Sequence, residues 1–370
     1  MTKDEVLKAL SNVQEPDLGK DLVTLNMIRD LEIEGNNVSF TIVLTTPACP
    51  MKEMMQNACI NAIKILVNAE ANVTVKFTSS TTTIRSDKNA VLPNVKNIIA
   101  VVSGKGGVGK STVAANLAIA LSQGGAKVGL MDADIYGPSV PIMFGVRGER
   151  PQMTDRDGKG VIVPLERYGI KLLSIGLLVD EKSAVVWRGP MVSSAIRQFI
   201  SDVLWGELDY MIIDMPPGTG DIHLTLMQTA PVTGIVVVTT PQDVALADAK
   251  KGIAMFGQAQ LNVPIIGLVE NMSYFTPPGK NGDESTDHKI YIFGKDGGKR
   301  LAEEYELPFL GQIPLIQSIR EGGDIGIPVM MSDDEESKKA FYDFAGNVAR
   351  STSMRNAHMK SEVIAEVVED

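Results

Sequence analysis

Two patterns of apolar and polar positions divide the chain near residues 86–97 and predict two folded units. In residues 1–85, apolar residues at helical spacing predict a helix near Lys3–Ser11 and another after Pro50. Alternating apolar and polar runs on either side of a Gly-Asn-Asn turn predict strands in the same unit. The predicted strands are Ile28–Ile33, Val38–Leu44 and Val73–Phe77. Residues 1–85 are therefore predicted to form a small α+β domain.

The helix after Pro50 has one apolar face. Six residues recur at steps of three and four and are predicted to be buried together: Met51, Met55, Cys59, Ala62, Ile63 and Leu66. A cysteine on such a face more often packs as a small hydrophobic residue than acts as a ligand. We therefore expect Cys59 to have a structural role.

Beyond residue 98 the apolar residues form short uninterrupted runs, which is the pattern of parallel strands buried on both faces. The runs are Ile98–Val102, Lys127–Met131, Tyr210–Asp214, Gly234–Thr239, Pro264–Val269 and Pro308–Ile313. Segments with helical spacing lie between most of these runs. The alternation predicts an α/β fold with a doubly wound, mostly parallel sheet over residues 98–350. Residues 86–97 are the expected linker, and residues 351–370 are expected to form a charged tail.

Composition and charge narrow the class of protein. The chain has 370 residues, of which 44% are hydrophobic and 22% charged, values typical of a globular α/β protein. Its formal net charge of -10 argues against binding of nucleic acid, which depends on lysine and arginine. We expect no membrane span and no signal peptide, because no apolar stretch has the required length. Two cysteines are too few for a secreted disulfide framework, so we expect a cytoplasmic protein.

The run SGKGGVGKST contains the pattern of a phosphate-binding loop. An apolar run precedes it and helical spacing follows it, as this motif requires. Glycines let backbone N–H groups converge on phosphate oxygens, the start of the helix adds positive potential, and Lys110 adds a full charge. The hydroxyl of Ser111 is the expected ligand of Mg²⁺. The residues expected to contact the nucleotide in this loop are Gly104, Lys105, Gly106, Gly107, Val108, Gly109, Lys110, Ser111 and Thr112.

The same glycines also fit the dinucleotide pattern Gly-x-Gly-x-x-Gly, with Asp132 near the position of a ribose-binding acid. Two features favour the phosphate loop. Lys110, Ser111 and Thr112 suit phosphate and magnesium and are not needed in a dinucleotide turn. Asp214 ends an apolar run, a place where a carboxylate commonly serves Mg²⁺. We therefore predict binding of ATP with Mg²⁺, and a dinucleotide oxidoreductase is the disfavoured alternative.

Four segments carry a family resemblance: SGKGGVGKST, VGLMDADIYGPSVP, YMIIDMPPGTGD and GLVENMSYF. Together they resemble the deviant Walker A ATPases, which include MinD and ParA, and within them the Mrp/ApbC type of iron-sulfur cluster carrier. The resemblance extends over residues 95 to about 350, and DADIYGPSVP and DMPPGTGD are specific to that branch. Residues 45–50, TTPACP, resemble part of the small iron-sulfur assembly domain that often precedes this ATPase.

The resemblance implies roles for individual residues. Lys105 resembles the signature lysine that reaches the partner's ATP across a dimer, so a homodimer is implied. Asp134 is the implied switch residue that positions the attacking water, Asp214 the magnesium-side carboxylate, and Asn271 an adenine contact. Lys105, Lys110 and Asp134 are thus the expected catalytic residues. A structural alternative stays open for Asp134, which can cap a turn, and for Asn271, which can form a turn before a serine.

The chain departs from the family at the expected cluster site. Carriers of this type place a Cys-x-x-Cys pair after the segment that matches ENMSYF, whereas this chain has the polar run Thr276–Asp283. Iron in clusters is held chiefly by thiolates, and only Cys49 and Cys59 remain. Cys49 lies between two prolines at an expected helix start, where positive potential favours a thiolate. We predict Cys49 as an iron-sulfur ligand or delivery contact, with a turn residue of no chemical role as the alternative.

The three histidines indicate no metal site. His223 follows an acid in a switch-like segment, where a lone histidine is more often structural. His288 and His358 lie in polar stretches without a paired ligand. We therefore predict no zinc site.

We expect an ATP-hydrolysing carrier that transfers iron-sulfur clusters to apoproteins, with the nucleotide opening and closing a homodimer. The alternative is a positioning or partition ATPase of the MinD or ParA kind, whose output is membrane or nucleoid binding. MinD-like attachment needs a basic amphipathic helix at the carboxyl end. The end of this chain, SEVIAEVVED, is acidic, which disfavours membrane attachment.

Overall fold

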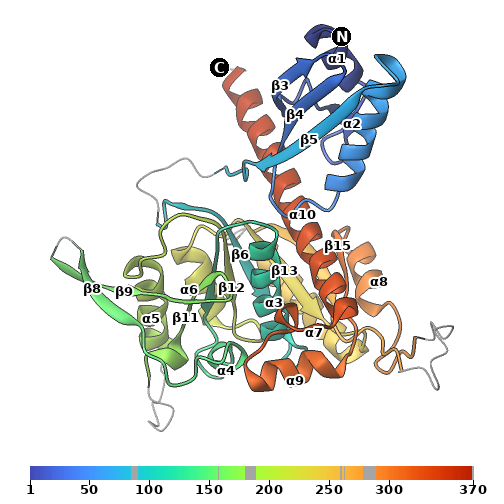
Figure 1. Ribbon diagram of the computed structural model, residues 1–370. Coiled ribbons are helices and arrows are strands. Elements are labelled where there is room, and N and C mark those ends of the chain that lie inside the picture. The colour runs from blue at the N-terminus through green and yellow to red at the C-terminus, as the bar shows by residue number, and fades with distance from the viewer. Residues whose placement is uncertain are drawn as a thin grey trace. The chain divides into compact units, whose positions relative to one another are not determined.

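The chain divides into two compact units (Figure 1). A computed structural model describes residues 1–84, 91–156, 158–179, 189–258, 261, 263–277 and 289–368. It does not describe the side chains of residues 189, 190, 221 and 360–368. Met1–Ile84 and Ser353–Asp370 form the first unit, and Arg85–Thr352 forms the second.

A three-stranded sheet and two helices form the core of the first unit. The strands are β3 (Ile28–Glu34), β4 (Asn37–Leu44) and β5 (Asn72–Ser79), and the helices are α1 (Lys3–Leu10) and α2 (Lys52–Leu66). β4 lies in the middle, antiparallel to β3 and parallel to β5. Every second residue of β4 is buried, so the alternation in its sequence separates core from surface. The predicted α+β elements of this unit are confirmed. Two short paired strands, β1 (Gln14–Glu15) and β2 (Lys20–Asp21), were not predicted.

The buried face of α2 follows the predicted stripe except at its end. Met55, Cys59 and Ile63 are fully buried in the core of the first unit. Leu66 is the last residue of α2 and is 58% exposed, so its predicted burial is wrong. Periodicity identifies which face of a helix is covered, but it does not show how far along the helix the covering elements extend.

The carboxyl-terminal residues belong to a long helix. α10 runs from Glu335 to Val368, and its residues from Ser353 onward belong to the first unit. There the amide of Asn356 donates to the carbonyl oxygen of Thr82 at 3.1 Å, and the hydroxyls of Ser353 and Thr82 are 3.3 Å apart. Ser353 and Asn356 are buried, so polar residues that suggested a solvated tail instead fix α10 to the segment after β5.

A sheet of eight strands forms the centre of the second unit. Its strands are β6 (Val95–Val102), β7 (Val128–Asp132), β10 (Leu165–Arg167), β11 (Ile170–Ser174), β12 (Leu208–Asp214), β13 (Gly234–Thr239), β14 (Ile265–Glu270) and β15 (Phe309–Gln312). The strand order is β10-β11-β7-β12-β6-β13-β14-β15, and only the edge strand β10 is antiparallel to its neighbour. All six predicted runs are strands of this sheet. β10 and β11 were missed, because both are short and each carries charged residues.

Helices cover both faces of this sheet, so the predicted doubly wound fold is confirmed. The helices are α3 (Lys110–Gln123), α4 (Val140–Met143), α5 (Gly189–Ser201), α6 (Asp221–Thr229), α7 (Asp243–Phe256), α8 (Gly297–Glu304) and α9 (Gln317–Ile325). Apolar residues of α5, α6, α7 and α8 join one core cluster with inward-facing residues of the strands. α3 packs against β7 and β12, and its residues Val113–Leu121 are all buried. A hairpin of β8 (Gln152–Arg156) and β9 (Lys159–Val163) projects from the unit (Figure 1).

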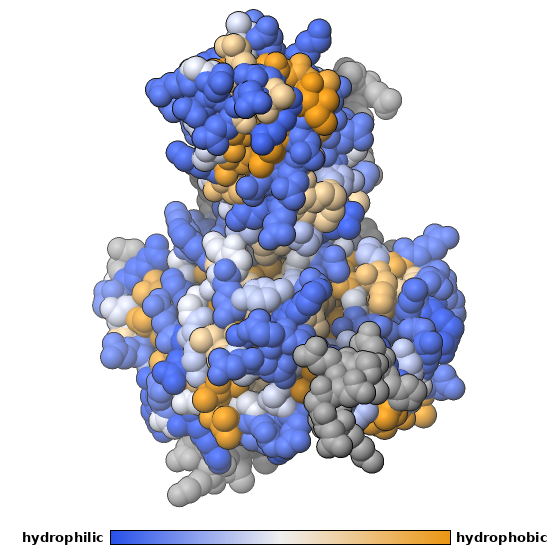
Figure 2. Space-filling view, turned by 45° about the vertical axis from the view of Figure 1, so that its right-hand side comes forward, coloured by the Kyte–Doolittle hydropathy of each residue, from blue (hydrophilic) through white to orange (hydrophobic). Residues whose placement is uncertain are grey.

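The surface of the chain is mainly hydrophilic on the face that Figure 2 shows, with apolar residues in small groups. Among the described residues, no helix combines the length and the apolar character that crossing a bilayer requires.

Candidate nucleotide-binding site

The carboxyl ends of the central parallel strands meet at one edge of the sheet, and the candidate site residues lie there. Parallel register places Asp214 of β12 beside Asp132 of β7, and Asp132 beside Ser174 of β11. On the other side of β12, Asp214 pairs with Val101 of β6, the strand that leads into the phosphate loop. The register of the sheet therefore brings together polar residues that are far apart in sequence.

The phosphate loop connects β6 to α3, and its backbone requires glycine, as Gly104 and Gly109 show. Gly109 has φ of 81° and immediately precedes α3, a backbone conformation that other residues rarely adopt. A Cβ atom at Gly104 would lie 2.2 Å from the backbone of Asp248 in α7, so no side chain fits there. The loop thus ends at the amino terminus of a 14-residue helix, where unpaired N–H groups and the helix dipole favour phosphate.

Lys110 is the centre of a buried cluster of charges. Its Nζ lies 2.5 Å from Oδ1 of Asp214, 3.9 Å from Oδ2 of Asp134 and 3.2 Å from Oγ of Ser111. The side chain of Lys110 is only 6% exposed, so its charge is little screened by solvent. The structure therefore brings together four of the residues that the sequence predicted for the nucleotide site.

Asp214 and Ser111 fit a magnesium ion. Asp214 is fully buried, and its Oδ2 is a buried oxygen without a hydrogen-bond partner. Such an orphaned carboxylate oxygen is costly unless a ligand compensates it. The Nζ of Lys110 donates hydrogen bonds both to the Ser111 hydroxyl and to the Asp214 carboxylate. Two oxygens of this kind belong to the donor set that Mg²⁺ takes, with phosphate oxygens and water completing it.

Asp132 has a structural position beside this cluster. Its Oδ1 accepts the backbone N–H of Asp134 at 3.1 Å, and its Oδ2 accepts the hydroxyl of Ser174 at 2.8 Å. Burial, with the nearby Asp214 carboxylate, raises the pKa of Asp132 to about 8. Both oxygens are engaged within the protein and the residue is fully buried, so Asp132 is not placed to hold a ribose.

Asp134 lies between the lysine and a cavity. Burial raises the pKa of Asp134, and the Lys110 charge opposes this shift. Its side chain is 13% exposed and lines a cavity of about 650 Å³ together with Pro217 and His223. The Asp134 side chain also caps a turn, as the structural alternative predicted. The backbone N–H groups of Tyr136 and Gly137 donate to it, and these hydrogen bonds lower its pKa.

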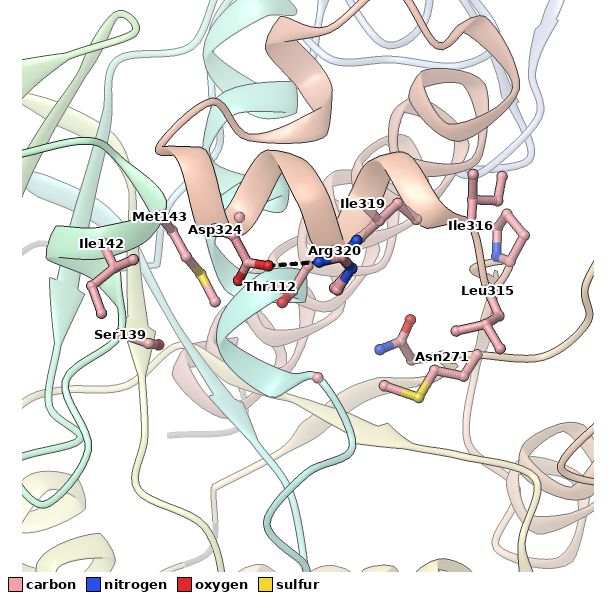
Figure 3. Close-up of a pocket in the computed structure, with 14 residues that line it drawn as sticks. Thr112, Ser139, Ile142, Met143, Asn271, Leu315, Ile316, Ile319, Arg320 and Asp324 are labelled. Atoms are coloured by element: carbon pink, nitrogen blue, oxygen red, sulfur yellow. Dashed lines mark hydrogen bonds and ion pairs between the residues drawn. The ribbon is translucent and has the colours of Figure 1, made fainter.

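Asn271 links β14 to the phosphate loop and lines a second cavity (Figure 3). Its Nδ2 donates to the carbonyl oxygen of Val108 at 2.8 Å, and its backbone N–H donates to Thr239. The cavity has a volume of about 330 Å³. Its wall includes Thr112 at the start of α3, Leu315 after β15 and Ile319 on α9. A mostly apolar cavity at the end of a phosphate loop has the size and character that suit a flat heterocyclic base.

Sequence reasoning missed two groups of residues at this edge. Ser174 is the last residue of β11, a strand that the apolar pattern did not predict. Leu315 and Ile319 lie about 200 residues after the phosphate loop, and no local signal ties them to it. The only cue was Pro314 just after β15, because a proline at the carboxyl end of a strand often shapes a loop there.

Lys105 is exposed and does not join the Lys110 cluster. The hydroxyl of Ser103 donates to the Lys105 carbonyl at 3.0 Å, which fixes the backbone of the loop and leaves the lysine side chain on the surface. The structure thus places the two lysines of the loop in different environments, one buried among carboxylates and one in solvent.

The two cysteines also lie in different environments. Cys59 is fully buried in the core of the first unit, and burial raises the pKa of its thiol to about 12. Cys49 is half-buried three residues before α2, and neither cysteine is in a disulfide. Within the described ranges, no group of three or more His, Cys, Asp and Glu residues is arranged to hold a metal ion. Residues 278–283 of the polar run and His288 lie outside the described residues.

Comparisons with known proteins agree with this fold. Residues 94–349 match the family model described as ParA: NUBPL iron-transfer P-loop NTPase, and residues 3–77 match that of an iron-sulfur cluster assembly protein. The chain is 50% identical to the iron-sulfur cluster carrier protein of Synechocystis sp., over 96% of this chain and 99% of that one. It is 44% identical to the iron-sulfur cluster carrier protein of Escherichia coli K12, over 91% of this chain and 88% of that one.

A solved structure is similar as well. The nucleotide-binding protein of Archaeoglobus fulgidus in complex with ADP is 38% identical, with a TM-score of 0.56, and the match covers 68% of this chain and 94% of that chain. The fold and the site define a P-loop nucleotide-binding protein of the α/β class. The chain belongs to the ParA-type family of iron-transfer P-loop NTPases, and the resemblance predicted from its four segments is confirmed.

Proposed function

We propose that this chain binds and hydrolyses ATP with Mg²⁺ and uses the nucleotide to carry iron-sulfur clusters to apoproteins. The observation that supports it most is the buried cluster in which Lys110 lies between Asp214 and Asp134 at the end of the phosphate loop. The names of the relatives from Synechocystis and Escherichia coli, both iron-sulfur cluster carrier proteins, support the choice of cargo.

Each polar residue of the site takes one role in this proposal. Lys110 neutralises the terminal phosphates, and Ser111 with Asp214 holds Mg²⁺, which supplies charge to the phosphate oxygens when it is bound. Asp134 orients the attacking water from the cavity that it lines. Asn271 contacts the adenine, and the 330 Å³ cavity beside it takes the base. Phosphoryl transfer depends mainly on position and charge neutralisation, which this arrangement provides.

A homodimer completes the proposal. Lys105 is exposed, so it is free to leave the loop surface for the nucleotide of a second copy. A lysine supplied by the partner couples hydrolysis to the dimer, because the charge it adds is present only when the two copies meet.

The domain limits and the cargo contact are also part of the proposal. We assign residues 1–85 to an iron-sulfur assembly-type domain, residues 86–97 to a linker and residues 98–350 to the ATPase domain. Residues 351–370 are the charged carboxyl-terminal segment, and those from Ser353 onward group with the first unit. Cys49 is the proposed thiol that contacts a cluster, because it is more accessible than Cys59. The protein is proposed to act in the cytoplasm, where thiols stay reduced.

The test is anaerobic cluster reconstitution of the wild type beside Cys49→Ala and Cys59→Ala. We measure visible absorbance, bound iron and transfer of the cluster to an apoprotein, with and without ATP. The wild type and Cys59→Ala are expected to bind and transfer a cluster, and Cys49→Ala to lose most of both. A wild type that holds and transfers no cluster would leave a nucleotide switch without this cargo and would contradict the carrier assignment.

A further inference from the structure

His223 is a buried residue that the proposed chemistry does not use. It lies in the first turn of α6, is 1% exposed and faces the loop of residues 215–220 that follows Asp214. Its Nε2 is 3.0 Å from the carbonyl oxygen of Pro216, and its Nδ1 is 3.3 Å from that of Gly220. The ring packs at 6.2 Å from the ring of Phe256 on α7, so its plane is fixed from the other side.

The two carbonyl contacts determine which nitrogen carries the proton. Burial lowers the pKa of His223 more than the two carbonyl contacts raise it, and the Lys110 charge also lowers it, so the neutral imidazole with one N–H is favoured near pH 7. The Gly220 carbonyl already accepts the backbone N–H of His223 at 3.0 Å. The Pro216 contact is the shorter of the two ring contacts. We therefore assign the proton to Nε2, which then donates to Pro216.

The loop that accepts this hydrogen bond has few anchors of its own. Pro216 and Pro217 have no N–H group, so they cannot donate to a neighbouring strand. Backbone bonds from Met215 to Val101 and from Gly218 to Ser103 tie the loop to the end of β6. The carbonyl of Pro216, between these two points, is held by the His223 ring.

The position of this loop matters to both sides of the site. A Cβ atom at Gly106 of the phosphate loop would lie 3.9 Å from Cγ of Pro217, so the two loops lie side by side. Pro216 and Pro217 also line the 650 Å³ cavity together with Asp134. A shift of the loop would change both the neighbourhood of the phosphate loop and the space in front of Asp134.

We propose that His223 is a positioning residue for ATP hydrolysis, whose Nε2–H holds the Pro216 carbonyl and keeps residues 215–220 beside the phosphate loop. The inference rests on the proposed ATPase function, because its readout is turnover. In this proposal His223 acts through the loop and not through direct contact with nucleotide or metal. Binding of ATP depends mainly on Lys110 and the loop glycines, so removal of the imidazole is expected to slow hydrolysis more than it weakens binding.

The experiment compares three substitutions in the full-length protein. His223→Leu removes the donor, His223→Asn keeps an amide that is too short to reach Pro216, and His223→Gln places an amide N–H near the position of Nε2. For each we measure kcat, ATP affinity and melting temperature. His358→Leu on the exposed part of α10 is the matched control. We expect kcat to fall about tenfold in the Leu and Asn variants, with ATP affinity within about threefold of wild type, and to recover in the Gln variant.

The outcomes separate this inference from the proposed function. A wild type without ATP turnover would contradict the ATPase proposal itself. Wild-type turnover in His223→Leu, or a Gln variant as slow as the Asn variant, would overturn the positioning role alone. Parallel losses of kcat, affinity and melting temperature in both amide variants would also overturn it, because they would indicate a packing role only. If His223→Leu fails to fold, the Gln and Asn pair decides between these outcomes.

Discussion

The ATPase unit and the small first unit contrast in how much chemistry each assembles from its own residues. In the ATPase unit, the sheet edge gathers a lysine, a serine and two aspartates around one buried nitrogen. In the first unit, the only two thiols of the chain are Cys59 in the core and the half-buried Cys49 before α2. The comparison teaches that the nucleotide part of the proposed function is preorganised within one chain. The cargo part depends on a single accessible thiol and on what a second copy or a partner adds.

Lys110→Ala is expected to have the largest effect, because it removes the cation that lies against the buried Asp214 carboxylate and near the carboxylate of Asp134. ATP affinity should fall by about 100-fold or more, and the free energy of unfolding by about 3 kcal/mol. Equilibrium titration with ATP and chemical denaturation measure the two changes. Lys127→Ala is the matched control, since Lys127 is 65% exposed and pairs only with the exposed Glu207. Unchanged ATP affinity in Lys110→Ala would contradict the phosphate-loop assignment.

Asp214→Asn comes next and tests the magnesium role. The amide keeps the shape of the side chain but removes the charge that a divalent cation needs. We expect turnover to fall about 100-fold at ordinary Mg²⁺ concentration, with partial recovery when Mg²⁺ is raised. The test is to measure the turnover of wild type and Asp214→Asn across a titration of Mg²⁺. A magnesium dependence identical to that of the wild type would place the metal elsewhere.

Lys105→Ala is expected to have a smaller effect and sharpens the contrast between the two loop lysines. Because the Lys105 side chain is exposed, its removal should change ATP affinity in the monomer by less than about threefold. Turnover should fall about tenfold, and it should become independent of protein concentration. Sedimentation with ATP and assays over a range of protein concentrations test this. Wild-type turnover by a monomeric Lys105→Ala variant would contradict the trans-lysine proposal.

Thiol labelling tests the two cysteines of the first unit. Of the changes considered, labelling is expected to have the smallest effect on ATP binding and turnover. The pKa of Cys59 is about 12, so at pH 8 its thiolate fraction is about one in ten thousand and labelling of the folded protein should be slow. Cys49 should account for the fast phase, which Cys49→Ser removes and Cys59→Ser leaves. As pH rises toward 12 the Cys59 thiolate becomes populated, so the difference between the two rates should narrow. Equal rates at pH 8 would contradict the buried position of Cys59.

Sequence patterns predicted the parts of the fold that depend on local spacing. The six uninterrupted apolar runs gave six strands of the parallel sheet, and alternation gave β3, β4 and β5. The same reasoning missed the edge strand β10 and its neighbour β11, because both are short and carry charged residues. It expected residues 351–370 to be a charged, loose or peripheral helix and did not predict the burial of Ser353 and Asn356, because their contacts to Thr82 leave no apolar signature in the sequence.

The candidate site divides in the same way. Lys110 and Ser111 were predictable, because the glycine pattern and the following helix form one local motif. The distances from Lys110 to Asp214 and Asp134 follow from strand order, and strand order depends on how crossover helices pack and not on any local segment. The His223 contact to Pro216 was not predictable either, since two carbonyl oxygens and a ring must meet in three dimensions.

By itself, the sequence determined the phosphate loop, the class of sheet and the absence of a Cys-x-x-Cys pair at the family's cluster site, because each depends on residue identity over a few neighbouring positions. The tertiary structure alone decided that Lys110 is buried among carboxylates while Lys105 is exposed, and that Cys59 is buried while Cys49 is more accessible. Burial and charge pairing depend on elements distant in sequence, so identical residue types received opposite chemical environments. That difference in environment is what the proposed ATPase and carrier roles depend on.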